Sequence, residues 1–368
     1  MNGGSIKRTI STTNSYGRLT QKAVAKMLGI SPSVISLVMK NPDTTRASNE
    51  TKQRILDVLK KNPGSGKHAS EGDTILVINN PERNVYYYQS KMLFGIQSRA
   101  AEVGLKIHIA SPTHDVRSYV FGTPLRGLLL TAPDTVTKQV AELSKTTFSV
   151  TLNPQEHGTY TGDAVSPDYY AGMCQAVKHL VENGHTHIGY IGEKPQEADS
   201  RARERLRDFR EACEVSNVSL DEADIQLYVH DNDDENDRIA IDKILGQWKK
   251  LKRRPSAFIV YNDNLAIKIY QLAHTHSIRI PEDLSIIGHD NEPIGEQLLP
   301  KLTSISPEFF DLGRRAVDLL TSDKKLTKED LGFKLICPVK LIVRESVSRV
   351  RNNIDKTRKP TNEQEHKS

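Results

Sequence analysis

Short hydroxyl side chains stand in residues 19–59 at positions where helices would begin. Ser31 precedes Pro32, which favours the first position of a helix, and Ser48 precedes another helical pattern. A hydroxyl oxygen there caps backbone N–H groups, and the same helix ends attract phosphate anions. Gly29 lies where the chain must turn sharply between two helices. The spacing predicts a helix-turn-helix that meets nucleic acid.

Apolar residues in this segment repeat at helical spacing and predict three helices around one small core. Thr20 can cap the first helix, and a small residue at Ala25 with a branched one at Ile35 allows a close helix crossing. The apolar positions of the three helices are Ala23, Val24, Met27 and Leu28; Val34, Ile35 and Val38; and Ile55, Leu56 and Leu59.

The first turn of the second helix is expected in the DNA major groove, which is wide enough for one helix. Pro32, Ser33 and Leu37 would then face base edges, giving apolar contacts and one hydroxyl contact. The alternative is a three-helix unit without a nucleic-acid role.

Charge is segregated along the chain. Residues 1–70 hold 12 Lys and Arg against 3 Asp and Glu, a net charge of +9, which leaves −4 of the total +5 for the rest. A basic end on a mildly acidic body is typical of a phosphate-binding surface confined to that end. A merely soluble charged surface explains the composition but not the segregation.

The cysteines, Cys174, Cys213 and Cys337, lie far apart without metal-ligand spacing, so we expect reduced thiols and neither a disulfide scaffold nor zinc. No run of about 18 apolar residues and no signal-peptide core is present, which predicts a cytoplasmic protein without a membrane segment.

Strand and helix patterns alternate through the rest of the chain, which predicts parallel sheets with helices on both faces. About 275 residues are too many for one comfortable sheet, so two α/β lobes are expected. The predicted strands are 74–79, 105–110, 127–131, 148–152, 188–191, 226–229, 257–261, 284–288 and 340–343. The predicted helices are 88–103, 135–145, 169–183, 200–216, 236–252, 263–277 and 307–321, with a stunted helix within 111–122.

The fold class is therefore a small all-α helix-turn-helix head plus an α/β body of two doubly wound parallel-sheet lobes. We expect a disordered tail at 1–18, the head at 19–61, a linker at 62–73, a two-lobed effector-binding and dimerisation domain at 74–349, and a disordered tail at 350–368.

Phrases in head and body, in this order, resemble the lactose/galactose repressor family of bacterial transcription regulators. They are TQKAVAKMLGISPSVISLVM, LFGIQSRAAEVGLKI, AVSPDYYAGMCQAVKHLVENGHTHIGYIG, SRARERLRDFREAC, PSAFIVYNDNLAIKIYQLAHTHSIRIPEDLSIIGHDN and LLPKLTSI. The resemblance covers residues 19 to about 349. It implies a body like a periplasmic sugar-binding protein, and a regulator, typically a repressor, whose operator affinity responds to a small polar effector held between two lobes.

The resemblance also implies site residues. Those implied for the double-stranded DNA operator are Thr20, Gln21, Ser31, Pro32, Ser33, Ser36, Leu37, Lys40, Ser48, Thr51 and Lys52. Those implied for a sugar-like effector are Tyr86, Tyr88, Gln89, Asp168, Arg205, Asn262, Asp263 and Asp290. Carboxylates and arginine suit neighbouring hydroxyls, and tyrosine suits an apolar ring face. The alternative to effector binding is a role at a helix start for Asp168 and Asp263, and packing within a loop for Tyr86 and Tyr88.

Three segments depart from the family pattern. Residues 62–72 are rich in Gly and Ser and lack the family's hinge-helix leucine, so we predict less operator bending or a different hinge contact. Asp233, Asp234, Glu235 and Asn236 stand where the family often has an aromatic residue, and Asp208 stands where it has glycine.

Other functions fit less well. A solute-binding protein of the same body fold would lack the basic head and carry a signal peptide. An enzyme is not expected, because the GxGxxG, GxxxxGK[ST] and GxSxG motifs are absent, and His185 and His187 have no third ligand at metal spacing. No cofactor or metal is expected. Symmetric homodimerisation through the body would pair two heads on a two-part site in the nucleoid.

Overall fold

The computed structural model describes residues 21–40, 47–61, 72–79, 87–116, 119, 124–131, 137–145, 147–155, 162–195, 200–230, 233–322 and 333–350. The predicted N-terminal tail at 1–18, residues 62–71 of the predicted linker, and residues 351–368 of the predicted C-terminal tail lie outside the described residues. Within the described residues, no helix combines the length and the apolar character needed to cross a membrane.

Three helices form the head, as the apolar spacing predicts: α1 (Gln21–Leu28), α2 (Pro32–Lys40) and α3 (Asn49–Lys61). Val24, Ile35 and Ile55, one from each helix, are fully buried together. Gly29 adopts φ +69°, a left-handed conformation that glycine takes without strain, between α1 and α2. The prediction that Met27 belongs to the buried apolar stripe of α1 is wrong, because its side chain is 58% exposed.

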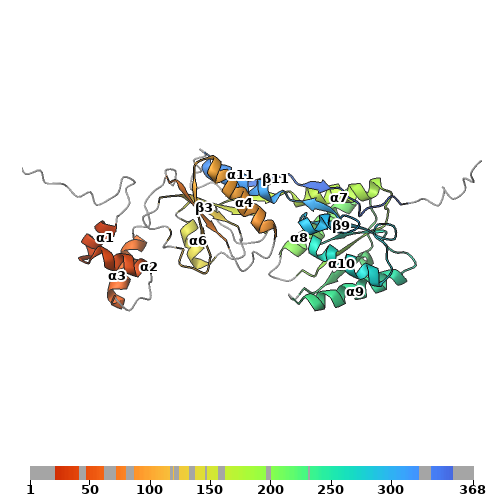
Figure 1. Ribbon diagram of the computed structural model, residues 1–368, viewed down its shortest axis with the longest axis horizontal. Coiled ribbons are helices and arrows are strands. Elements are labelled where there is room, and N and C mark those ends of the chain that lie inside the picture. The colour runs from red at the N-terminus through yellow and green to blue at the C-terminus, as the bar shows by residue number, and fades with distance from the viewer. Residues whose placement is uncertain are drawn as a thin grey trace, which may run out of the picture. The chain divides into compact units, whose positions relative to one another are not determined.

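The chain divides into two compact units, and the first holds a six-stranded sheet of order β11-β5-β4-β3-β1-β2. Its strands are β1 (Thr74–Ile78), β2 (Lys106–Ala110), β3 (Leu125–Leu130), β4 (Ser149–Leu152), β5 (Asp163–Pro167) and β11 (Lys334–Cys337). Its helices are α4 (Tyr87–Glu102), α6 (Lys138–Ser144) and α11 (Phe309–Thr321). Figure 1 shows α4 and α11 beside each other in this unit, with α6 apart from them.

The second unit holds another six-stranded sheet, of order β12-β10-β9-β8-β6-β7. Its strands are β6 (Ile188–Glu193), β7 (Ile225–Tyr228), β8 (Ala257–Val260), β9 (Ser285–His289), β10 (Thr303–Ser306) and β12 (Lys340–Ile342). Its helices are α7 (Tyr169–Glu182), α8 (Ser200–Val215), α9 (Asp234–Lys250) and α10 (Asp263–Thr275), with short 3₁₀ turns η3 (Glu222–Asp224) and η4 (Pro293–Glu296).

Alternation along β8 shows why helices cover both faces of the second sheet. Phe258 and Val260 pack into one apolar cluster with residues of α9 and α10. Ala257 and Ile259 point the other way, into a cluster with residues of α7 and α8. Successive strand residues face opposite sides, so a strand apolar at every position must be buried on both.

The fold class is confirmed, with two corrections to the strand predictions. Strands β5, β10 and β11 were not predicted. Asp163 in β5 and Ser304 in β10 break the apolar pattern, and β11 is short and mostly not buried. The sheets are not wholly parallel, since β12 runs antiparallel to β10.

Two glycines let α4 and α11 pack in close contact. A Cβ added at Gly95 would overlap the carbonyl oxygen of Phe310, and one added at Gly313 would overlap that of Met92. The helix backbones therefore touch where side chains normally separate them.

We predict that Gly95→Ala lowers the free energy of unfolding by about 2 kcal/mol, because the methyl group forces the helices apart. Urea unfolding of the full chain measures this loss. Gly246→Ala on α9 is the matched control, since its Cβ would meet only His276 Cε1 at 3.4 Å and no loss is expected. Equal losses in both variants would contradict the packing argument.

Candidate nucleic-acid and effector sites

The start of α2 presents the candidate base-reading residues. Ser31, Pro32 and Ser33 are exposed, and Leu37, one turn later, is half-buried. The Ser31 and Ser33 hydroxyls lie 2.7 Å apart, and Ser31 Oγ accepts a long bond of 3.4 Å from the Val34 amide. This turn therefore offers two hydroxyl groups and one apolar side chain to a partner.

The start of α3 presents a second group of candidates. Ser48 Oγ accepts from the Thr51 amide at 3.1 Å, which is the predicted cap, and lies 2.9 Å from Thr51 Oγ1. Lys52 Nζ is 3.5 Å from Asn49 Oδ1. Thr20 and the side chains of Gln21, Ser36 and Lys40 lie outside the described part of the chain.

Arg205 is the centre of the polar cluster in the second unit. It lies on α8 and is only 6% exposed, whereas the neighbouring Arg203 and Arg207 point to solvent. Its Nη2 donates to Asp290 Oδ1 at 3.0 Å, and its Nη1 donates to the Tyr261 carbonyl oxygen. The guanidinium carbon lies 4.5 Å from the centre of the Tyr261 ring.

Charge pairing sets the protonation of this cluster. Burial alone would raise the pKa of Asp290 and lower that of Arg205, since it disfavours both charged forms. The attraction between the two outweighs burial, so the pKa of Asp290 is below its usual range and that of Arg205 above it. Arg205 Nε is buried without a partner among the described residues, which leaves one donor for a ligand.

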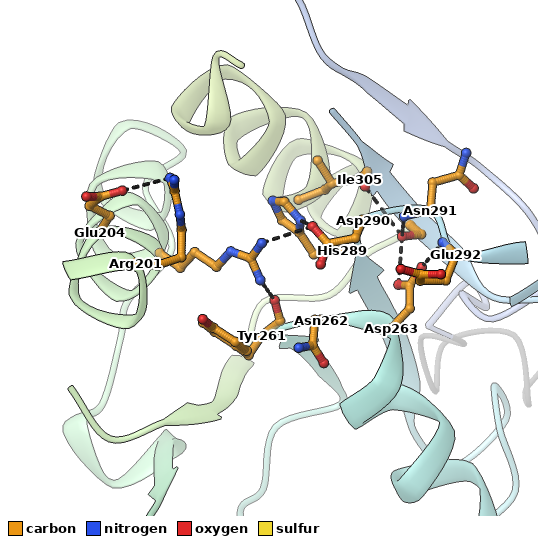
Figure 2. Close-up of polar contacts among 12 residues, drawn as sticks. Arg201, Glu204, Tyr261, Asn262, Asp263, His289, Asp290, Asn291, Glu292 and Ile305 are labelled. Carbon is orange, nitrogen blue, oxygen red and sulfur yellow. Dashed lines mark hydrogen bonds and ion pairs between the residues drawn. The ribbon is translucent and has the colours of Figure 1, made fainter. Parts of the chain in front are cut away.

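His289 completes the cluster at the end of β9. Its Nδ1 lies 2.8 Å from Asp290 Oδ1, and its ring centre lies 5.3 Å from that of Tyr169. Burial, helped by the Arg205 charge, lowers the pKa of His289 to about 4. A neutral ring protonated at Nδ1 donates from that atom to the Asp290 carboxylate, and Figure 2 shows the two side chains next to each other.

Asp168 and Asn262 act as helix caps in the structure. Asp168 Oδ1 accepts from the Ala171 amide at 3.0 Å at the start of α7, and Asn262 Oδ1 accepts from the Leu265 amide at 2.8 Å at the start of α10. Both side chains are half-buried. Capping occupies one oxygen of each, so it does not exclude a ligand contact.

Asp263 differs from the other candidates because it has no exposed surface. Its Oδ2 accepts from the Glu292 amide at 2.7 Å, and its Oδ1 accepts from Ser304 Oγ at 2.7 Å. Both oxygens therefore serve the protein, and the geometry places Asp263 beneath the site instead of on its surface.

The first unit carries the remaining candidates on α4. Gln89 is 2% exposed and its Oε1 has no partner among the described residues, while the Tyr88 ring packs against Phe309 at 5.1 Å. Tyr86 lies outside the described residues. Asn79 and Thr131, at the carboxyl ends of β1 and β3, are joined by a 2.8 Å hydrogen bond.

The acidic departures from the family pattern are satisfied locally. Asp233 caps α9 by accepting from the Glu235 amide at 2.9 Å, and Asp234 pairs with Lys268 at 2.8 Å. Asp208 is buried and bonded to Arg207 at 3.0 Å. These residues shape the second unit without needing a ligand.

His185 and His187, for which the sequence predicts no metal, each have hydrogen-bond partners within the protein. His185 lies within hydrogen-bond distance of Ser256 and the Ser348 carbonyl oxygen, and His187 of Asp224. In the described part of the chain, no three His, Cys, Asp or Glu side chains are grouped to hold a metal ion.

Sequence reasoning missed His289, Tyr169, Tyr261, Asn79 and Thr131. His289 and Tyr261 adjoin residues that were singled out, and Asn79 and Thr131 directly follow strands. The available signal was position: each of these residues lies at the carboxyl end of a strand or beside a candidate residue. Ligands of open α/β sheets bind at the carboxyl ends of the strands.

Comparisons with known proteins agree with this architecture. Residues 177–347 match the periplasmic binding protein-like domain. The chain is 26% identical to the HTH-type transcriptional regulator DegA of Bacillus subtilis, covering 88% of this chain and 97% of that one. Two solved structures share its fold. The first is a CelR–cellobiose complex, with 21% identity and a TM-score of 0.59, covering 89% of this chain and 100% of that chain. The second is the lac repressor dimer bound to operator and anti-inducer, with 18% identity and a TM-score of 0.60, covering 79% of this chain and 98% of that chain.

A helix-turn-helix head on a body of two α/β units, with polar groups gathered at carboxyl strand ends, defines a ligand-responsive DNA-binding class. Within that class, the chain is similar over most of its length to curated transcriptional regulators such as DegA, and it shares its fold with solved LacI-family regulators.

The pKa of His289 generates a prediction for stability. Unfolded histidine takes up a proton below about pH 6.5, but folded His289 does so only near 4, so the free energy of unfolding falls as the pH falls between these values. We expect His289→Asn, which can still donate to Asp290, to remove about 2 kcal/mol of the loss between pH 7 and pH 5.

Urea unfolding of the full chain at pH 7 and pH 5 measures that difference. The control is His274→Asn at an exposed position of α10, which should keep the wild-type dependence. An unchanged dependence in His289→Asn would show that this ring is not the titrating group.

Proposed function

We propose that the protein binds a two-part operator through α2 and releases or engages it when a small polar, sugar-like effector binds the body. The observation that carries the effector part is the buried Arg205–Asp290 pair, whose guanidinium keeps an Nε without a partner among the described residues. A CelR relative is described in complex with cellobiose, which supports a sugar as the first ligand class to test. Repression is the proposed direction of control.

The proposed operator contacts divide by chemistry. Ser33 and Leu37 read base edges, while helix starts at Ser31 and Ser48 meet phosphates, where backbone N–H groups favour anions. The remaining proposed DNA contacts are Thr20, Gln21, Pro32, Ser36, Lys40, Thr51 and Lys52.

The proposed effector contacts are Arg205, Asp290, Asn262 and Asp168 in the second unit. Arginine and carboxylate groups bind neighbouring hydroxyls in pairs. Gln89, with its unpartnered buried oxygen, and Tyr86 and Tyr88 are the proposed contacts from the first unit. No enzymatic step and no cofactor enters this proposal.

A homodimer is the proposed assembly, because one head buries little surface on DNA. In the first unit, Phe94 on α4 and Ile109 on β2 are 62% and 56% exposed, and large exposed apolar side chains of this kind are candidates for that interface. The proposed place of action is the cytoplasm, at the nucleoid.

For DNA recognition we predict that Ser33→Ala and Leu37→Ala each weaken binding to the preferred duplex by about tenfold, since a base contact contributes about 1–3 kcal/mol. The probe is a duplex selected from a random pool by the full-length protein, and affinity is measured by fluorescence anisotropy. Affinity for random duplex should stay unchanged.

Gln53→Ala is the matched control, because Gln53 is exposed on α3 and its bond among the described residues lies within that helix, to Asp57, at 2.9 Å. Unchanged affinity of both α2 variants for the selected duplex would remove α2 as the reading helix.

For the effector we predict that Arg205→Ala abolishes the response to sugar but keeps ligand-free binding to the selected duplex. Wild-type protein is screened against mono- and disaccharides, including cellobiose, for release or tightening of the duplex. Arg207→Ala, at a half-exposed position of the same helix, should respond normally.

Because the loss of Arg205 leaves Asp290 buried and unpaired, both variants are first melted and then assayed below the lower melting temperature. A normal sugar response in Arg205→Ala contradicts the assigned effector residues.

A further inference from the structure

Asp263 is a fully buried carboxyl group to which no cation among the described residues is bonded. Its two oxygens bind separate segments, the Glu292 amide after β9 and the Ser304 hydroxyl on β10, each at 2.7 Å. The charged groups that act on it are the acids Asp290 and Glu292. A buried group of this kind needs a reason beyond helix capping, since Asn262 already caps α10.

The segment that Asp263 holds has an unfavourable backbone. Asp290 adopts φ 94° and Asn291 adopts φ 49°, which is the left-handed region that non-glycine residues avoid. Such residues persist only where their surroundings fix them. Here the Glu292 amide donates to Asp263, and the Asn291 amide donates to Ser304 Oγ at 3.1 Å.

Ser304 and Asp263 therefore act as one anchor for two successive amides, and Arg344 adds a bond to Asn291 Oδ1 at 2.8 Å. The residue immediately before these amides is Asp290, which accepts from Arg205 and lies 2.8 Å from His289. Figure 2 shows Asp263 next to Glu292 and Asn291, with His289 and Tyr261 farther toward Arg201.

We propose that Asp263 is a positioning residue, which fixes the 290–292 loop so that Asp290 stays aligned with Arg205 for the effector. This inference rests on the proposed effector function, and it replaces direct ligand contact as the role of Asp263. The effector meets Asp290 and Arg205, and Asp263 acts only through the loop.

The proton on Asp263 gives the anchor a pH dependence. Burial raises its pKa to about 8, against the hydrogen bonds from Ser304 and Glu292. The neutral group still accepts from Glu292 on Oδ2 and donates from Oδ1 to Ser304. The ionised group repels the Asp290 and Glu292 carboxylates, and Tyr270 of the same helix is the other titratable group within its field. The anchor is therefore expected to loosen above pH 8.

The sign for stability follows from linkage. The folded carboxyl keeps its proton up to about pH 8, whereas the unfolded one loses it near 3.8, so the free energy of unfolding falls as the pH rises between these values. Asp263→Asn stays neutral, can accept from Glu292 and donate to Ser304, and should become progressively more stable than wild type from pH 5 to pH 8.

The test measures amide hydrogen exchange of residues 288–293 in the ligand-free full chain. Asp263→Ala should raise exchange there by about tenfold at pH 7, because two loop contacts are lost together. Asp263→Asn should restore the protection and remove any loss of protection between pH 7 and pH 9. Asp224→Asn is the matched control, a buried acid at the amino end of β7 that bonds His187.

Wild-type exchange in both Asp263→Ala and Asp263→Asn, at pH 7 and pH 9, would overturn the positioning role. If Asp263→Ala does not fold, Asp263→Asn still decides the matter through its pH dependence in exchange and in urea unfolding.

A second experiment measures the affinity for an effector by calorimetry. The ligand is cellobiose or the sugar with the largest effect in the screen. Asp263→Ala should bind it at least about tenfold more weakly and Asp263→Asn within about twofold of wild type. Equal affinity in all three proteins would overturn the inference. Absence of sugar binding in wild type would count against the proposed effector, while exchange would still decide the role of Asp263.

Discussion

The burial of one guanidinium group, that of Arg205, constrains the whole second unit. A cation that is 6% exposed needs a fixed counter-charge and fixed acceptors, because water no longer solvates it. Asp290 supplies the charge from the end of β9, and the Tyr261 carbonyl supplies an acceptor from the end of β8. Removing either partner of such a pair costs about 3–5 kcal/mol, so α8 and both strand ends must keep their register. The loop at 290–292 and its anchor exist to satisfy that demand.

Local periodicity was enough to predict most of this fold. Apolar stripes at helical spacing gave the three head helices, and Ser48 caps α3 as its sequence position indicates. Two of the missed strands, β5 and β10, have a common cause: they are buried by partners far away in the sequence. Asp163 on β5 accepts from the Phe333 amide at 2.9 Å, and Ser304 on β10 donates to Asp263. Because these polar groups are satisfied by tertiary contacts, a hydropathy pattern cannot mark their strands as buried.

The candidate site was predicted less completely, for a related reason. The resemblance singled out Arg205 among four neighbouring arginines, and the structure buries that one while Arg203 and Arg207 remain exposed. It could not separate surface contacts from supports, since Asn262 and Asp263 are adjacent and both polar. Only the contacts distinguish them: Asn262 is half-buried at a helix start, and Asp263 is enclosed with both oxygens occupied. Adjacent residues in one motif thus have different roles.

The chemistry of the head argues for its duplication. In the proposed contacts, Ser33 and Leu37 would provide one hydroxyl and one apolar contact, which at about 1–3 kcal/mol each would distinguish a correct site by only a few powers of ten. The +9 charge of residues 1–70 adds affinity for any duplex and does not select a sequence. Two heads on one two-part site double the selective energy while the non-selective part remains sensitive to salt. An effector that changes how two heads engage would therefore act on the sequence-specific part of the binding energy, which a single head would supply only once.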